Sequence, residues 1–102
     1  VEVIQIGDRL TVEEVELART LLTQATENVL PQVVLDLRSL RLVDSAGLTF
    51  LLDSTHACER KGGQLRLAGV GSLVAEVLEI TGLESEFNLH ADVVVAAGAF
   101  AR

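Results

Sequence analysis

Cysteine, proline and aromatic side chains are all scarce in this sequence. Its 102 residues include one Cys, one Pro, three Phe and no Trp, Tyr or Met. A single cysteine, Cys58, excludes an intramolecular disulfide, so we expect a buried structural thiol and a reducing, cytoplasmic setting. Because aromatic residues are few, the core must consist of Leu, Val, Ile and Ala, which is typical of helices packed on a buried sheet. A chain of this length folds as one domain without a disulfide or a metal.

Basic residues are also few. Eight Lys and Arg stand against 15 Asp and Glu, which gives a formal net charge of −7. This charge repels nucleic-acid phosphates and anionic lipid surfaces at long range, so we expect neither as a partner. A protein with a basic face is the partner that this charge favours.

Long apolar runs are missing as well. The stretch "VVVAAGAFA" at Val93 to Ala101 is far shorter than the roughly 20 residues that a membrane span needs, so we expect no membrane insertion. The amino terminus shows no basic region followed by an apolar one, and we therefore expect no signal peptide. The sequence starts almost inside a predicted strand, which leaves open that this N-terminal strand is truncated.

The first third of the chain carries a strand signal followed by a helix signal. The β-branched run "VEVIQI" at residues 1–6 predicts a strand that Gly7 ends. Thr11 and Glu14 have the spacing of a capping box, which predicts a helix from about Val12 to Asn28. Its expected buried stripe consists of Val15, Ala18, Leu22, Ala25 and Val29.

The middle of the chain repeats this order. After Pro31, the segment "VVLDL" at residues 33–37 is apolar on both faces except for Asp36, which predicts the central strand of a parallel sheet. A second helix is expected directly after "LVDSAG", with an apolar stripe that ends near Arg60 and Lys61 before a Gly-Gly pair. That stripe consists of Leu48, Leu51, Leu52, Thr55 and Cys58.

The last third contains weaker signals. We expect a strand in "QLRLAGV" from residue 64, then a short helix with Ser72 as its N-cap and Gly82 at its end. The segment "EFNLH" at residues 86–90 predicts a short edge strand. The tail is ambiguous between strand and helix, and we choose a helix capped by Asp92. Alternating strands and helices predict a single α/β domain, with a mostly parallel sheet and helices packed against it.

Candidate functional residues lie in "DSAG", where a strand ends and a helix begins. Ligand and partner sites in such sheets form at this kind of junction. Asp44 can cap the helix, while Ser45, Ala46 and Gly47 leave its end open to another surface. The residues alone are equally compatible with an ordinary cap and close packing of the helix on the sheet.

The order of four features resembles the STAS domain, which anti-sigma-factor antagonists share with the cytoplasmic tails of sulfate transporters. These features are an apolar strand ending in Asp-Leu, the Asp-Ser-x-Gly-Leu at the next helix start, the Gly-Gly pair and the closing Thr-Gly-Leu. The resemblance implies a non-enzymatic, bacterial and cytoplasmic protein-interaction module without a cofactor. Its implied partner is an anti-sigma factor with serine kinase activity, which phosphorylates the Ser or Thr just before that Gly.

This sequence departs from that pattern, because Ala46 occupies the position of the phosphoacceptor. Four explanations stay open: Ser45 is the acceptor instead, the protein binds constitutively, it docks on a transporter ATPase, or Ala46 was introduced by design. We expect the partner surface to include Asp44, Ser45, Ala46, Gly47, Thr49 and Asp53.

Enzyme and metal chemistry find little support in the sequence. Ser45 and His56 lie about 16 Å apart along one helix at 1.5 Å per residue, which excludes a hydrogen bond between them in a nucleophilic triad. No His and Cys cluster has the spacing of a metal site. "GVGS" at residues 69–72 lacks the Lys and the length of a phosphate-binding loop, so we interpret it as a strand-to-helix turn.

Overall fold

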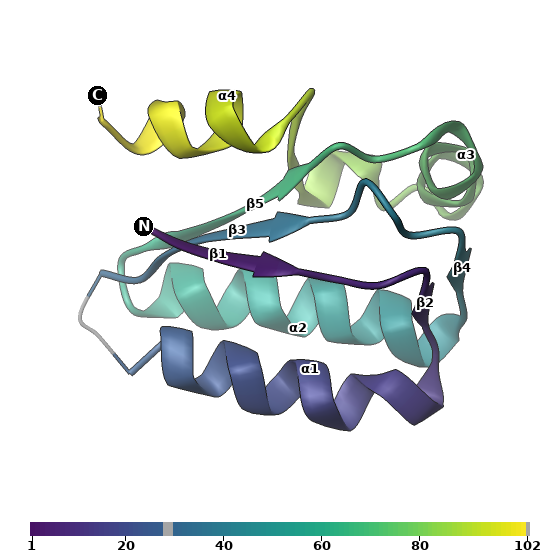
Figure 1. Cartoon of the computed structure of the whole chain (residues 1–102), viewed down its shortest axis with the longest axis horizontal. Helices are drawn as coiled ribbons and strands as arrows, with labels where there is room; N and C mark the ends of the chain where they lie inside the picture. Colours follow the sequence, from purple (N-terminus) through teal and green to yellow (C-terminus); the bar gives the residue numbers. More distant parts are fainter. Residues whose placement is uncertain (28–29, 102) are drawn as a thin grey trace.

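The computed structural model describes residues 1–27 and 30–101 and shows an α/β fold with three layers (Figure 1). Four parallel strands form the central sheet in the order β1-β3-β5-β6. Helices α1 and α2 cover one face of this sheet, and the short α4 lies on the other. This arrangement confirms the predicted α/β class and the central position of the strand that contains Asp36.

The elements follow one another with short connections. Their bounds are β1 Glu2–Gln5, β2 Arg9–Leu10, α1 Val12–Ala25, β3 Gln32–Asp36, β4 Leu42–Val43, α2 Ser45–Arg60, β5 Gln64–Ala68, α3 Ser72–Thr81, a 3-10 turn Glu84–Glu86, β6 Asn88–His90, α4 Val93–Gly98 and a final 3-10 turn Ala99–Ala101. Strands β2 and β4 pair in parallel as a separate two-stranded sheet. The sequence pattern had not predicted either of them.

The main core lies between the sheet and the pair α1 and α2. The predicted stripe of α1 is buried at Val15, Ala18, Leu22 and Ala25. In α2, Leu51, Thr55 and Cys58 are buried and Leu48 and Leu52 are half-buried, as the helical period requires. Burial raises the pKa of the Cys58 thiol to about 11, so this thiol has little thiolate character at neutral pH. The expectation of a buried structural cysteine is confirmed.

Some predicted boundaries are wrong. Helix α1 ends at Ala25 rather than near residue 28, while Asn28 and Val29 lie outside the described residues. Ser72 is not an N-cap, because the extended residue before α3 is Gly71 and Ser72 is already helical. The strand from Gln64 stops at Ala68, because the next residue, Gly69, has a positive φ of 73°.

Other local signals are confirmed by the structure. Thr11 forms the complete capping box, with its own N–H donating to Glu14 Oε1 over 2.9 Å. The tail is helical, and Asp92 caps α4 by accepting a hydrogen bond from the Val95 N–H over 2.8 Å. Within residues 1–27 and 30–101, no helix combines the length and hydrophobicity that crossing a bilayer requires.

The capping box leads to a test of helix nucleation. Replacing Thr11 with Ala should lower the free energy of unfolding by about 0.5–2 kcal/mol, because the first turn of α1 loses its side-chain acceptor. Thr20, an exposed residue inside the same helix, is the matched control, and T20A should change stability little. Urea denaturation of both variants measures the difference. Equal effects of the two substitutions would contradict a capping role for Thr11.

Candidate functional site

The β2 and β4 pair brings two helix N-termini together. Leu10 of β2 lies opposite Val43 of β4 in the parallel register. Each strand is followed after a single residue by a helix, α1 at Val12 and α2 at Ser45. Because the two strands run in the same direction, both helices start at the same end of the pair. The first N–H groups of both helices therefore face the same region.

Asp44 bonds to both of these helix ends. Its Oδ1 accepts a hydrogen bond from the Gly47 N–H over 2.9 Å, which caps α2 as predicted. Its Oδ2 accepts from the Val12 N–H over 3.0 Å, which ties the start of α1 to the same carboxylate. These bonds, first from Gly47 and then from Val12, hold the pKa of Asp44 below its ordinary value of 3.8. The charge is also favourable because it lies at the positive end of two helix dipoles.

Gly47 is required by close packing. A Cβ added at this position would lie 2.1 Å from the carbonyl oxygen of Leu10 and 2.7 Å from the Cγ2 of Val43. The first turn of α2 therefore rests directly on the β2 backbone. This contact explains one of the small residues of "DSAG" by packing alone, without reference to a partner.

The remaining predicted docking residues differ in exposure. Ala46 is half-buried and packs against the main core. Ser45, Thr49 and Asp53 are all exposed and lie four residues apart on α2. Residues at this spacing lie on one face of a helix, so the structure brings these three side chains into one exposed stripe. We call these three residues the α2 stripe.

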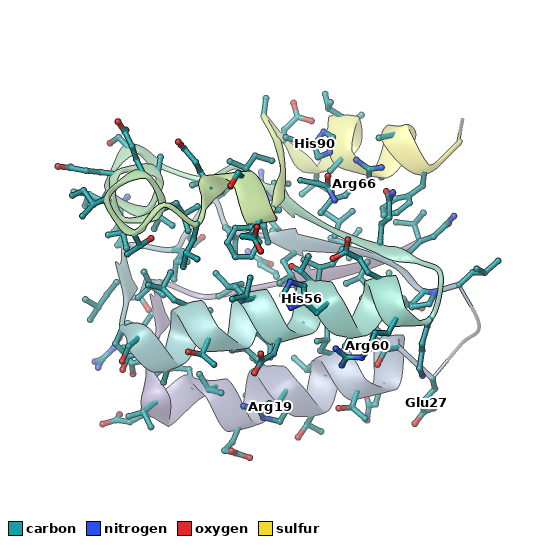
Figure 2. All side chains as sticks on the ribbon, turned by 180° about the vertical axis from the view of Figure 1, so that it is seen from behind. Arg19, Glu27, His56, Arg60, Arg66 and His90 are labelled. Atoms are coloured by element: carbon teal, nitrogen blue, oxygen red, sulfur yellow. The ribbon has the colours of Figure 1, made fainter. Side chains whose placement is uncertain are left out.

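The structure places His56 away from Ser45. His56 lies on the same helix and approaches Glu86, with 3.8 Å between His56 Nε2 and Glu86 Oε1. In Figure 2 it lies midway along α2, far from the helix start. Within the part of the chain that the structure describes, no three His, Cys, Asp or Glu residues are grouped closely enough to hold a metal ion.

Sequence reasoning missed two features of this region. The hydrogen bond from Val12 to Asp44 joins residues that are 32 positions apart in the sequence, and no local sequence pattern predicts it. The second feature is the buried Asp36 at the end of β3, whose pKa is lowered chiefly by hydrogen bonds from the Arg38 guanidinium. The Arg38 Nη2 lies 2.9 Å from Asp36 Oδ2. This pair satisfies the carboxylate next to the strand end.

The double role of Asp44 gives a pH-dependent prediction. D44A should destabilise the fold more than T11A does, because two helices lose an acceptor. D44N should fall between D44A and the parent, since its one amide oxygen can still cap α2. A folded-state pKa below the unfolded value stabilises the fold above that unfolded value, and this stabilisation disappears as the pH falls through the folded pKa. The difference in melting temperature between parent and D44N should therefore be full at pH 7 and shrink below about pH 4. A difference that does not depend on pH would contradict this role.

The packing of Gly47 gives a second prediction. G47A should lower the free energy of unfolding by about 1–3 kcal/mol or more, because the added methyl group overlaps a backbone oxygen. Gly98, in α4, has open space around a built Cβ, so G98A is a control that should leave stability unchanged or raise it. Thermal unfolding of both proteins checks the difference. A G47A protein as stable as the parent would show that α2 can move away from β2 without cost.

Comparisons with solved structures agree with this fold. A sulfate transporter family protein from Wolinella succinogenes is 24% identical with a TM-score of 0.75, over 98% of this chain and 83% of that chain. A Thermotoga maritima protein assigned as an anti-sigma factor antagonist is 18% identical with a TM-score of 0.80, over 98% and 88% of the two chains. The phosphorylated form of SpoIIAA, a Bacillus cell fate determinant, is 20% identical with a TM-score of 0.69, over 98% and 89%.

Likeness at these identities shows a common fold and does not assign a partner. No protein in the curated set matches the sequence significantly. The sequence model of the STAS domain matches residues 1–96, which is nearly the whole chain. This chain therefore belongs to the STAS domain family.

Proposed function

We propose that this STAS domain is an anti-sigma-factor antagonist that binds an anti-sigma factor through the start of α2. The observation that carries the proposal is the α2 stripe, which begins at the capped N-terminus of that helix. STAS domains are in general non-enzymatic interaction modules, so the function is sought in a binding surface. Fold neighbours that are named as antagonists support the choice of partner class.

The geometry of the stripe suits recognition by a protein. Ser45, Thr49 and Asp53 project from a helix whose opposite face is buried at Phe50 and Leu51. The helix start is held against β2 and α1 by Asp44 and Gly47. The stripe therefore lies on a rigid support. Binding of a partner would cost this chain little conformational entropy.

The charge of the region indicates the chemistry of the partner. The stripe contains Asp53 and follows directly after Asp44, in a chain with a net charge of −7. A basic surface on the anti-sigma factor would complement it and accelerate association.

Ser45 is the candidate phosphoacceptor of this surface. Its side chain is exposed, and the cap of α2 uses the Asp44 carboxylate rather than the Ser45 hydroxyl. A phosphate there would add about −1.5 to −2 charges at a helix N-terminus, which the helix dipole tolerates. Because Asp44 already accepts the bonds of Gly47 and Val12, the phosphate would project outward, and its bulk would displace a partner packed on the helix start. Without modification of Ser45, the same surface would bind constitutively.

A transporter-linked role is the alternative. It is favoured by the likeness of the chain to a sulfate transporter family protein and to the STAS domain of a Vibrio cholerae SulP transporter. In this alternative the same helix start docks on a transporter ATPase. Both roles predict the same surface on this chain, and only the identity of the bound protein distinguishes them.

Site-specific photo-crosslinking tests the proposed partner and surface together. A photoreactive amino acid at Thr49 should crosslink in native cells to a protein that mass spectrometry identifies as an anti-sigma factor. The matched position is Thr20, an exposed Thr on α1, where little crosslinking is expected. S45E, which places a larger side chain at the helix start, should weaken binding of the purified partner by steric exclusion at least tenfold, or about 1.4 kcal/mol, with an unchanged melting temperature.

Two results would argue against this function, and a third would remove only the phosphorylation switch. A transport ATPase in the crosslinked product would support the alternative role. Equal crosslinking from Thr49 and Thr20 would place the docking surface elsewhere. If intact-mass analysis finds no phosphate on Ser45 after incubation with ATP and the partner, despite tight binding, the switch is removed and a constitutive antagonist remains.

A further inference from the structure

The face of the sheet that lies under α4 contains a cationic side chain in an otherwise small and apolar setting. Along β5, Leu65 and Leu67 face the main core, and the alternation places Arg66 on the opposite face. On this opposite face, Val34, Ala68 and Ala96 form the small apolar cluster that holds α4. Figure 2 shows Arg66 beside His90 beneath this helix. Arg66 is half-buried there.

Arg66 contacts His90, Gln64 and Phe100 in the described residues, and none of these side chains carries a carboxylate. Its Nη1 lies 2.8 Å from His90 Nε2, and its Nη2 donates to Gln64 Oε1. The guanidinium carbon lies 4.7 Å from the centroid of the Phe100 ring. Since a guanidinium can only donate, Nε2 of His90 is the acceptor in this contact. The remaining polar atom, Nε, is buried and has no acceptor among the described residues.

Among residues 1–27 and 30–101, this arrangement leaves the charge of Arg66 without a counter-charge. The two ion pairs found in residues 1–27 and 30–101 join Asp36 to Arg38 and Glu86 to His56, and neither includes Arg66. A partly buried charge is costly unless it is paired and fully hydrogen-bonded. The chain has 15 acidic residues, yet none of those in the described residues forms an ion pair with Arg66. Arg66 therefore fits an anion that comes from outside the chain.

A hollow beside Arg66 gives such an anion room. It has a volume of about 290 Å³ and lies where β3 and β5 begin, next to the end of α4. The side-chain amides of Gln32 and Gln64 border it, together with Arg66 and Phe100. Gln32 and Gln64 are neighbours in the β3 and β5 register, so their amides lie on the same face as the guanidinium. The size suits a small molecule rather than a peptide.

We propose that this hollow is a binding site for the oxyanion group of a small molecule, a phosphate or a carboxylate. An Arg side chain binds such groups through two parallel N–H bonds. Here the pair is Nε–H and the Nη2–H that now contacts Gln64, and because Nε is buried, the guanidinium must turn toward the hollow to present this pair. Gln64 is exposed, so its amide can turn over and donate an N–H to the same oxyanion. Binding would satisfy the orphan Nε and neutralise the charge of Arg66.

Titration followed by NMR tests the site directly. Inorganic phosphate and acetate are added separately to the isotopically labelled protein, with sodium chloride at matched ionic strength as the control. One of the two should shift the Arg66 Nε–H and Gln64 side-chain signals along a saturable curve, and the tighter anion identifies the ligand group. R66Q should weaken this response at least tenfold, while R60Q, at an exposed Arg of α2, should not.

A substitution at Gln64 tests whether Arg66 lacks an anionic partner, and it leaves the guanidinium in place. Q64E places a carboxylate against Arg66, so it should raise the melting temperature and abolish the phosphate or acetate response. Q24E makes the same charge change at an exposed position on α1 and should do neither. The proposal is overturned if neither anion acts beyond sodium chloride, or if Q64E responds as the parent does. Because Q64E retains Arg66, its result is decisive even if R66Q loses its fold.

Discussion

The carboxylate of Asp44 is the interaction on which the rest of this site depends. Two helices begin at the same end of the β2 and β4 pair, and each exposes backbone N–H groups that need an acceptor. One side chain supplies both acceptors, at 2.9 Å to Gly47 and 3.0 Å to Val12. The bond to Val12 also fixes α1 relative to α2. A single residue thus sets the position of the helix start from which the α2 stripe projects.

The small residues that follow Asp44 have different reasons for being small. Gly47 is required by the backbone of Leu10, which leaves no room for a Cβ. Ala46 fills part of the gap between α2 and the core. Ser45 has no packing role, because it is exposed and the cap does not use its hydroxyl. Gly47 is therefore constrained by the structure, whereas the Ser45 hydroxyl is not. Of these two residues, only Ser45 is available to a partner.

Features set by local physics could be predicted from the sequence, and features set by tertiary contact could not. The capping box at Thr11, the caps Asp44 and Asp92 and the exposed spacing of the α2 stripe follow from helix geometry. Strands β2 and β4 are too short to show an alternation of apolar and polar residues. They form because the fold brings their two segments side by side, where they pair in parallel. Ser72 was expected to be a cap because its residue type favours that position, but the extended backbone falls on Gly71. The hydrogen bond from Val12 to Asp44 depends on the pairing of β2 with β4. It could not be predicted from the sequence because that pairing could not be predicted.

The separation of the two faces of α2 explains how this fold can serve different partners. Phe50, Leu51 and Cys58 are buried and constrain the core, whereas Ser45, Thr49 and Asp53 make no contribution to it. Substitutions at exposed helix positions change stability little, so charge and hydroxyl groups on this stripe can vary while the sheet and its helices stay the same. The structural likeness to a sulfate transporter family protein and to an antagonist shows that the fold is common to both. If α2 is the docking surface that we propose, the identity of the partner is encoded in its exposed residues rather than in the fold.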